Sequence, residues 1–218
     1  MEPTRWPGVY REGRDLYTVN LTPGIRVYGE TLRSVDGIEY RAWDPFRSKL
    51  AALLHRAGTF DFPRNPRSAL YLGGAHGTTV SHLSDIFPTA PIFVVEKSPT
   101  AFAPLLALSR RRPNLFPLLA DAQLPERYQA DVGEVDLVYQ DVAQRNQAAI
   151  FSENVQACLI PEGLGVLMLK VRSVTQQRST SEVVRDARGV LTREGLGIQS
   201  ETALAPFSRD HVAFVVTM

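Results

Sequence analysis

The strongest constraint on the fold of this chain is segment 69–80, which reads ALYLGGAHGTTV. An apolar run of strand length ends in Gly73, Gly74 and Gly77, and a helical pattern begins directly after them. In α/β proteins this order of strand, glycine turn and helix brings bare backbone and a helix N-terminus against a ligand. The alternative is that the glycines only form a tight connection between strand and helix.

The glycine spacing excludes two common phosphate-binding loops. In a dinucleotide fingerprint, G-x-G-x-x-G, that starts at Gly73, the second and third glycines are replaced by Ala75 and Thr78. A P-loop requires a lysine after its last glycine, and here Thr78 follows Gly77. The turn is therefore suited to a ligand without phosphates, and S-adenosylmethionine is such a ligand.

Acidic residues stand at the ends of three further apolar runs: Glu96 ends 92–96, Asp121 follows 115–119 and Asp141 follows 135–140. Glu96 lies about 20 residues beyond the glycine turn, where a strand-end carboxylate binds ribose hydroxyls. Because the carboxyl ends of parallel strands meet at one edge of a sheet, we expect the three acids to converge on one crevice.

Composition narrows the class of protein. With 218 residues, 44% of them hydrophobic, the chain can bury a sizeable core. It has neither an apolar run of about 18 residues nor a signal peptide, so we expect a cytoplasmic protein without membrane partners. A single cysteine, Cys158, excludes an internal disulfide, and His76 and His82 lack partners at metal-ligand spacing, so no metal site is expected. The net charge of +1 is weak for a protein that holds nucleic acid unaided.

The chain divides into a small N-terminal β domain, residues 1–42, and a larger domain, residues 43–218. Turn signals and short β-branched or aromatic runs at 16–19 and 25–28 predict a small antiparallel sheet. Asp44 and Pro45 then predict an N-cap and first turn of a helix that buries Phe46, Leu50, Leu53 and Leu54 and ends before Gly58.

From Ala69 onward, strands and helices alternate, which predicts an α/β, doubly wound, Rossmann-like sheet. We expect helices at 78–87, 99–111, 144–158 and 178–194, and strands at 164–169, 197–204 and 212–217. The last two strands indicate a hairpin whose final strand is antiparallel.

Four segments together resemble fibrillarin, and the similarity covers nearly the whole chain: YLGGAHGTTVSHLSD at 71–85, WDPFRSKLAA at 43–52, DVAQ at 141–144 and RDH at 209–211. The chain is similar to the archaeal form, since it lacks a glycine- and arginine-rich tail. At His76 it departs from the family, where serine is common.

The resemblance implies an S-adenosylmethionine-dependent methyltransferase that modifies ribose 2′-hydroxyls of rRNA and tRNA. It further implies a C/D box guide RNA and its target RNA, a Nop-family scaffold protein and a kink-turn-binding ribosomal protein as partners. We expect the scaffold to dock on the N-terminal sheet through aromatic residues such as Trp6, Tyr10 and Tyr28, although these side chains also suit the sheet's own core.

The resemblance implies the catalytic residues, and the cofactor-binding residues are predicted at the glycine turn and the strand ends. The catalytic set corresponds to Lys49, Asp141, Lys170 and His211. The cofactor-binding set is Gly73, Ala75, Gly77, Thr78, Thr79, Glu96, Lys97, Asp121, Ala122, Asp141 and Gln144. Within it, the two threonines at the helix start suit the carboxylate end, Glu96 the ribose and Asp121 the adenine amino group.

The residue types of the catalytic set fit the chemistry. Lys170, partly desolvated at a strand end, is suited to accept the proton of a 2′-hydroxyl. Asp141 would hold that amine, and Lys49 would oppose the resulting rise in its pKa and stabilise the developing alkoxide. His211 would orient the hydroxyl or relay the proton. The ordinary alternatives are that Lys170 extends into solvent and that Asp141 caps the following helix.

Two other function classes stay open at this point. One is a stand-alone S-adenosylmethionine-dependent methyltransferase of another RNA or of a small molecule, which the acidic strand ends fit equally. The other is a noncatalytic subunit or a nucleotide-binding oxidoreductase, which the missing fingerprint glycines and the intact acids and lysines disfavour.

Overall fold

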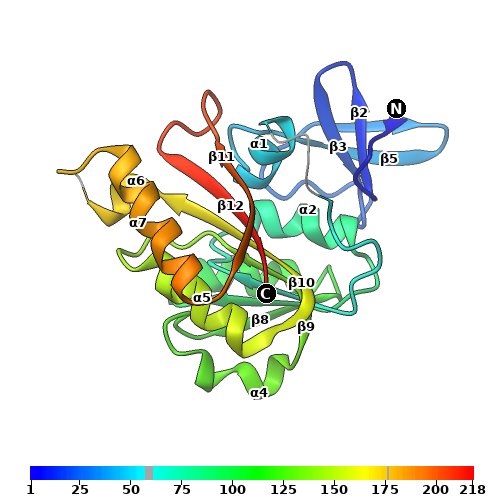
Figure 1. Ribbon diagram of the computed structural model, residues 1–218. Helices are drawn as coiled ribbons and strands as arrows, with labels where there is room; N and C mark the ends of the chain where they lie inside the picture. Colours follow the sequence, from blue (N-terminus) through cyan, green and yellow to red (C-terminus); the bar gives the residue numbers. More distant parts are fainter. Residues whose placement is uncertain (57–60, 176) are drawn as a thin grey trace.

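A computed structural model describes residues 1–56, 61–175 and 177–218 of the chain. These residues form a small N-terminal sheet and a large sheet covered by helices on both faces (Figure 1). The small sheet is antiparallel, with the strand order β1-β2-β3-β5-β4. Its strands are β1 (Glu2–Pro3), β2 (Val9–Glu12), β3 (Asp15–Val19), β4 (Leu32–Val35) and β5 (Ile38–Trp43).

The large sheet has the strand order β11-β12-β10-β9-β6-β7-β8. Its strands are β6 (Ala69–Leu72), β7 (Ile92–Glu96), β8 (Leu115–Leu119), β9 (Val135–Gln140), β10 (Leu159–Lys170), β11 (Gly197–Ala203) and β12 (His211–Thr217). The five strands from β8 to β10 are parallel, whereas β12 enters antiparallel between β10 and β11. The expected doubly wound sheet with a final antiparallel strand is confirmed.

Helices cover both faces of this sheet. They are α1 (Lys49–Arg56), α2 (Thr78–Ile86), α3 (Pro99–Ser109), a 3-10 turn η1 (Pro125–Arg127), α4 (Gln129–Val132), α5 (Gln147–Cys158), α6 (Val171–Val174) and α7 (Thr180–Arg193). Apolar residues of α1, α2 and α3 pack on one face, and those of α4, α5 and α7 on the other. In the described part of the chain, no helix is long and apolar enough to cross a membrane.

A network of buried charges joins the small sheet to α2. Arg41 of β5 pairs with Glu30 at 2.6 Å and with Asp85 of α2 at 2.7 Å. Arg112, in the turn after α3, pairs with the other Asp85 oxygen at 2.6 Å. We call Glu30, Arg41, Asp85 and Arg112 the interface network. Because the two arginines and two carboxylates are almost fully buried, they hold the small sheet in one position on the large one.

His82 packs beside the interface network. Its ring stacks on Trp43 with 4.9 Å between centroids, and its two nitrogens lie 2.8 Å from the Thr18 hydroxyl and 2.7 Å from the Tyr28 hydroxyl. Burial, together with Arg41 and Arg112, holds the pKa of His82 well below its ordinary value. The neutral ring is therefore part of the interface between the two sheets.

The helix expected from Pro45 begins later, at Lys49. The Asp44 carboxylate accepts a hydrogen bond from the Phe46 backbone at 2.8 Å and closes a turn, and the Ser48 hydroxyl then accepts from the backbone of α1. The expectation that Phe46 is buried is wrong, because this turn leaves its side chain 69% exposed. The expected end before Gly58 lies outside the described residues.

The expectation of a strand at 25–28 is also wrong. The Glu30 carboxylate accepts hydrogen bonds from the backbone nitrogens of Val27 and Tyr28, which takes the donors that a strand would give to its neighbour. Trp6, expected on a docking surface, is instead buried in the core. The division into domains at residues 42 and 43 stays a prediction, and β5 extends one residue past it.

Candidate active site

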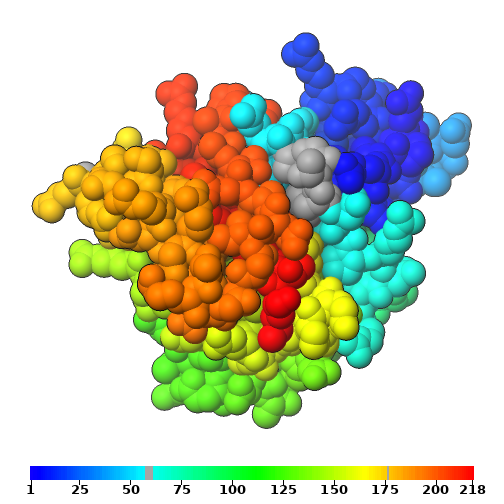
Figure 2. Space-filling view, viewed as in Figure 1, coloured from blue at the N-terminus to red at the C-terminus, as the bar shows by residue number. Residues whose placement is uncertain are grey.

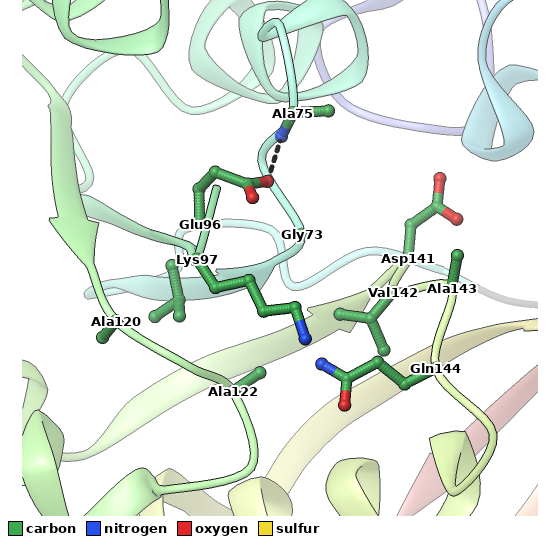
Figure 3. A pocket seen from close by; sticks show the side chains of 11 residues that line it. Gly73, Ala75, Glu96, Lys97, Ala120, Ala122, Asp141, Val142, Ala143 and Gln144 are labelled. Carbon is green, nitrogen blue, oxygen red and sulfur yellow. Dashed lines mark hydrogen bonds between the residues drawn. The ribbon is translucent and has the colours of Figure 1, made fainter. Parts of the chain in front are cut away.

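A cavity of about 310 Å³ opens where β6, β7 and β9 end (Figure 3). Parallel strands present their carboxyl ends there, as the acidic strand ends predict. The cavity is lined by Gly73, Ala75, Val95, Glu96, Lys97, Ala120, Ala122, Asp141, Val142, Ala143 and Gln144. Among the expected cofactor-binding residues, Gly77, Thr78, Thr79 and Asp121 are not in this lining.

The glycine turn makes room mainly for the protein's own chain. At Gly73, where φ is +88°, a Cβ atom would lie 2.5 Å from the backbone oxygen of Asp141. At Gly77 a Cβ would lie 2.5 Å from a Leu108 methyl, and at Gly74 it would collide with Val94 and Leu105. Gly73 therefore lets β6 end against Asp141, whereas the other two glycines admit α3 and β7.

Glu96 holds the turn from the end of β7. One carboxylate oxygen accepts the Ala75 backbone N–H at 2.9 Å, drawn as a dashed line in Figure 3, and the other accepts the Ser98 N–H at 2.8 Å. Ala75 has φ +45°, a left-handed conformation that this bond stabilises. A carboxylate oxygen has further lone pairs, so Glu96 can still accept from ligand hydroxyls in the cavity.

Asp121 lies outside the cavity lining but contacts two lining residues, Gln144 and Lys97. It accepts from the Gln144 amide at 3.4 Å and from the Gln123 backbone at 3.1 Å, and Lys97 Nζ is 3.8 Å away. Partial burial acts to raise its pKa, but these hydrogen bonds and the Lys97 charge hold the pKa below its ordinary value. The residue is therefore a carboxylate that orients Gln144.

The two threonines at the start of α2 have different surroundings. The Thr79 hydroxyl donates to Ser48 at 3.1 Å, which ties α2 to the residue before α1. The Thr78 backbone oxygen accepts from Ser81 within the helix. Thr79 thus acts here as a link between helices, and binding of a ligand carboxylate by either threonine stays a prediction.

Lys49, Asp141, Lys170 and His211, the residues predicted to be catalytic, come together beside the cavity, and we call these four the catalytic cluster. Lys49 Nζ lies 2.6 Å from Asp141 Oδ2, and these side chains are 30% and 16% exposed. Lys170 ends β10, next to β9, and pairs in register with His211 of β12. Burial raises the pKa of Asp141 while Lys49 and Lys170 act to lower it. Asp141 is thus paired with Lys49, whereas the sequence had suggested Lys170.

His211 is the neutral member of the catalytic cluster. Burial, and then the charges of Lys49 and Lys170, lower its pKa to about 3. Its Nδ1 lies 2.8 Å from the Ser208 hydroxyl, and Nε2 has no hydrogen-bond partner among the described residues. A neutral imidazole with one unused nitrogen can orient a hydroxyl group of a substrate.

Two buried glutamines that the sequence reasoning missed position the ends of β9 and β10. The Gln147 amide accepts the Lys170 backbone N–H at 2.8 Å and donates to the Lys170 backbone oxygen at 3.1 Å. Gln140, directly before Asp141, donates at 2.7 Å to the Gln147 backbone oxygen. Gln147 therefore substitutes for a neighbouring strand at Lys170, and no local sequence pattern signals such a role.

The donor set of the site limits its ligands. Glu96 and Asp141 give the cavity an acidic border, and Asp121 adds to it from outside the lining through its contacts with Gln144 and Lys97. Lys97 is the only lining cation in the described chain. Such a border suits hydroxyl groups, amino groups and positive charge, and disfavours phosphates. No group of three or more His, Cys, Asp or Glu residues that could hold a metal is found among the described residues.

Comparisons with known proteins agree with this geometry. A fibrillarin-like rRNA/tRNA 2′-O-methyltransferase of Methanothermobacter thermautotrophicus is 41% identical over 96% of this chain and 93% of its own length. The crystal structure of Aeropyrum pernix fibrillarin with natively bound S-adenosyl-L-methionine superposes with a TM-score of 0.89, at 40% identity over 99% of this chain and 96% of that one.

A third similar structure is a fibrillarin/Nop5p complex, with a TM-score of 0.86 and 37% identity over 100% of this chain and 99% of the matched one. The sequence model of the family described as "Fibrillarin" matches residues 1–218, the whole sequence. On its sequence, its fold and the extent of these matches, the chain belongs to the fibrillarin family.

Proposed function

We propose that this chain is an S-adenosylmethionine-dependent RNA 2′-O-methyltransferase and the catalytic subunit of a C/D box guide ribonucleoprotein that modifies rRNA and tRNA. The observation that carries the proposal is the catalytic cluster beside a cavity with an acidic border. The names of the relatives support the reaction, and the S-adenosyl-L-methionine bound to the Aeropyrum pernix structure supports the cofactor.

The residues of the cavity fit this cofactor. Glu96, with both oxygens at the end of β7, is placed to accept ribose hydroxyls, and Gln144 with Asp121 would receive the adenine amino group. Gly73, which has no side chain, and Ala75, which has only a methyl group, would leave room for the methionine end. The acidic border complements the positive sulfur, and the scarcity of cations agrees with a ligand without phosphates.

The catalytic cluster would move the proton of the target hydroxyl. When bound, S-adenosylmethionine supplies a methyl group activated by positive sulfur. Two lysines face one carboxylate, so loss of a proton from Lys170 leaves one ammonium opposite one carboxylate. Lys170 then accepts the 2′-hydroxyl proton as the oxygen attacks, Lys49 stabilises the negative charge on that oxygen, and His211 orients the hydroxyl.

The proposed assembly contains a Nop-family scaffold protein, a kink-turn-binding protein, guide RNA and target RNA. The fibrillarin/Nop5p structure supports the scaffold, since that relative resembles this chain over its whole length. The net charge of +1 is low for a protein that binds RNA through phosphate contacts alone, which supports partner proteins that contribute to RNA binding. Base pairing with the guide would then select the nucleotide.

Reconstitution tests the proposal. The chain is assayed with S-adenosylmethionine and target RNA, first alone and then with scaffold, kink-turn protein and guide RNA. We expect 2′-O-methylation at the guided nucleotide only in the full assembly. Efficient, site-selective methylation by the chain alone would place it among stand-alone methyltransferases, and no methylation in either case would overturn the activity.

A further inference from the structure

An exposed aromatic pair stands at the edge of the catalytic cluster. The Phe46 ring packs edge-to-face on Phe207, with 5.2 Å between centroids, and Phe207 also lies 5.2 Å from the His55 ring. Phe46 is 69% exposed, the largest value among the exposed large apolar residues of the described chain. The outer face of Phe46 is therefore free to receive a partner, whereas Phe207 is partly buried against the core and supports it.

The backbone on both sides of the pair is well ordered by hydrogen bonds. Asp44 accepts from Phe46, Arg47 and Ser48, which fixes the turn before α1. In the loop between β11 and β12, Leu204 accepts the Phe207 and Ser208 N–H groups. The ring of Phe46 is thus held outward by a closed turn, and its exposure is a property of the fold.

Both segments of the pair also carry catalytic residues. Lys49 follows Phe46 by three positions, and His211 follows Phe207 by four, with Ser208 bonded to His211 between them. In Figure 2 the cyan surface of the α1 segment lies against the orange-red surface of the β11–β12 hairpin. The aromatic pair therefore lies on the two segments that also carry Lys49 and His211.

Charge next to the pair indicates the chemistry of its partner. The neighbouring residues Arg47 and Arg209 are both exposed. Arg47 is held by a 2.9 Å bond to the Tyr28 backbone oxygen and by its position 4.9 Å from the Tyr28 ring. An exposed aromatic ring with arginines next to it in the sequence suits RNA, because bases stack on such rings and phosphates pair with guanidinium groups.

We propose that Phe46 and Phe207 form a stacking surface for the target RNA at the nucleotide next to the methylated ribose, with Arg47 and Arg209 as phosphate contacts. This inference rests on the proposed RNA methylation. Phe46 acts as a positioning residue: it holds the strand so that the 2′-hydroxyl lies at Lys170, and takes no part in proton transfer.

The chain provides a matched control. Phe116 of β8 is also exposed and packs on a second phenylalanine, Phe93, with 5.6 Å between centroids, but it lies on the opposite edge of the large sheet. Phe46→Ala and Phe116→Ala remove the same ring from comparable surroundings. Phe46→Leu and Phe46→Trp separate apolar contact from aromatic stacking.

The experiment measures single-turnover methylation in the reconstituted assembly at increasing target RNA. We expect Phe46→Ala to raise the RNA concentration for half-maximal rate about tenfold, since one base stacked on an aromatic ring contributes about 1–3 kcal/mol. Phe46→Trp should restore the wild-type value and Phe46→Leu should not. Phe116→Ala should match wild type, and affinity for S-adenosylmethionine should stay unchanged in every variant.

A photoreactive 5-iodouridine next to the target nucleotide gives a second readout, because it should cross-link to the peptide that contains Phe46. Unchanged RNA dependence in Phe46→Ala, while wild type methylates normally, would overturn the inference and leave the proposed function intact. Weaker association of Phe46→Ala with the scaffold protein, without a change in RNA dependence, would assign the pair to protein contact and also overturn it. A wild-type assembly that binds RNA and does not methylate it would instead contradict the proposed function.

Discussion

The interface network and the catalytic cluster are built from the same kinds of side chain, yet their charges are arranged differently. In the interface network two arginines meet two carboxylates, and each close pair is 2.6–2.7 Å apart and buried. In the catalytic cluster two lysines share one carboxylate, and Lys49 and Asp141 stay partly exposed. The first cluster is balanced, and the second carries one excess positive charge.

The difference separates charges that hold the fold from charges suited to react. A balanced buried network resists any change of protonation, since removal of one member leaves another buried and unpaired. An unbalanced cluster beside a cavity can gain or lose a proton with a smaller electrostatic penalty. We therefore expect substitutions in the interface network to act on stability, and substitutions in the catalytic cluster to act on rate.

The largest effect is expected at Lys170. Lys170→Ala should lower the methylation rate about 1,000-fold, within the range of a general base, while affinity for S-adenosylmethionine is retained. Lys170→Arg should be as inactive, because a guanidinium does not release its proton at accessible pH. Single-turnover assays and calorimetry measure the two quantities. A substantially active arginine variant would show that only the positive charge matters at this position.

Substitutions in the interface network should lower the stability of the fold and not act directly on the methylation rate. Asp85→Asn leaves two buried arginines without their shared carboxylate and should lower the free energy of unfolding by about 3–5 kcal/mol. Denaturant titration measures this loss. The control is Asp186→Asn, whose 2.7 Å pair with Arg178 is exposed to solvent, so that its loss should change the free energy of unfolding far less. Equal losses in the two variants would remove the distinction between buried and exposed pairs.

Gln147 connects stability to rate, because its amide binds the backbone of Lys170. Gln147→Met keeps the size of the side chain and leaves the Lys170 N–H and C=O groups unpartnered, at a cost of about 1–3 kcal/mol. We expect kcat to fall about tenfold with KM for RNA unchanged. Gln156→Met, at an exposed position of the same helix, serves as the control. A lower stability with unchanged kcat would mean that Gln147 acts on the fold alone.

The effect of pH is small at neutral pH and grows only as the solution becomes acidic. The pKa of His211 is about 3 in the folded protein, below the 6.5 of an unperturbed histidine. As pH falls below 6.5, the unfolded chain binds a proton that the folded chain rejects, so stability present above pH 6.5 is lost toward pH 3. The His211→Gln variant should lack this loss, which is at most about 1.4 kcal/mol per pH unit. Urea titrations at several pH values measure the free energy of unfolding of the wild type and of His211→Gln. If His211 did not contribute, this free energy would depend on pH in the same way in both proteins.

The sequence predicted the parts of the site that follow from strand order. Asp141 and Lys170 stand at the ends of consecutive apolar runs, and parallel strands necessarily bring such ends together. His211 came only from the family resemblance, since its pairing with Lys170 depends on β12 entering antiparallel beside β10. Local periodicity contains no information about that insertion.

Two of the remaining differences arise where a carboxylate accepts the backbone N–H groups of residues close to it in the sequence, and a third arises from a distant ion pair. Glu30 accepts backbone N–H groups of the apolar run 25–28, which therefore forms a loop instead of a strand. Asp44 closes a turn at Phe46, so that α1 begins only at Lys49. Arg112 is buried because Asp85 of another helix accepts a hydrogen bond from it, and Glu30 is itself held by Arg41 of β5. Such contacts depend on the tertiary fold, so propensity alone could not locate them.

The place of β12 in the sheet has a consequence for biosynthesis. Its partners β10 and β11 both leave the ribosome before it, and each keeps an open hydrogen-bonding edge until residues 211–217 arrive. A nascent chain that stalls before His211 therefore lacks part of the catalytic cluster and exposes two strand edges, the feature most prone to pairing with other chains. Completion of the large sheet and of the predicted catalytic cluster therefore depends on the same strand.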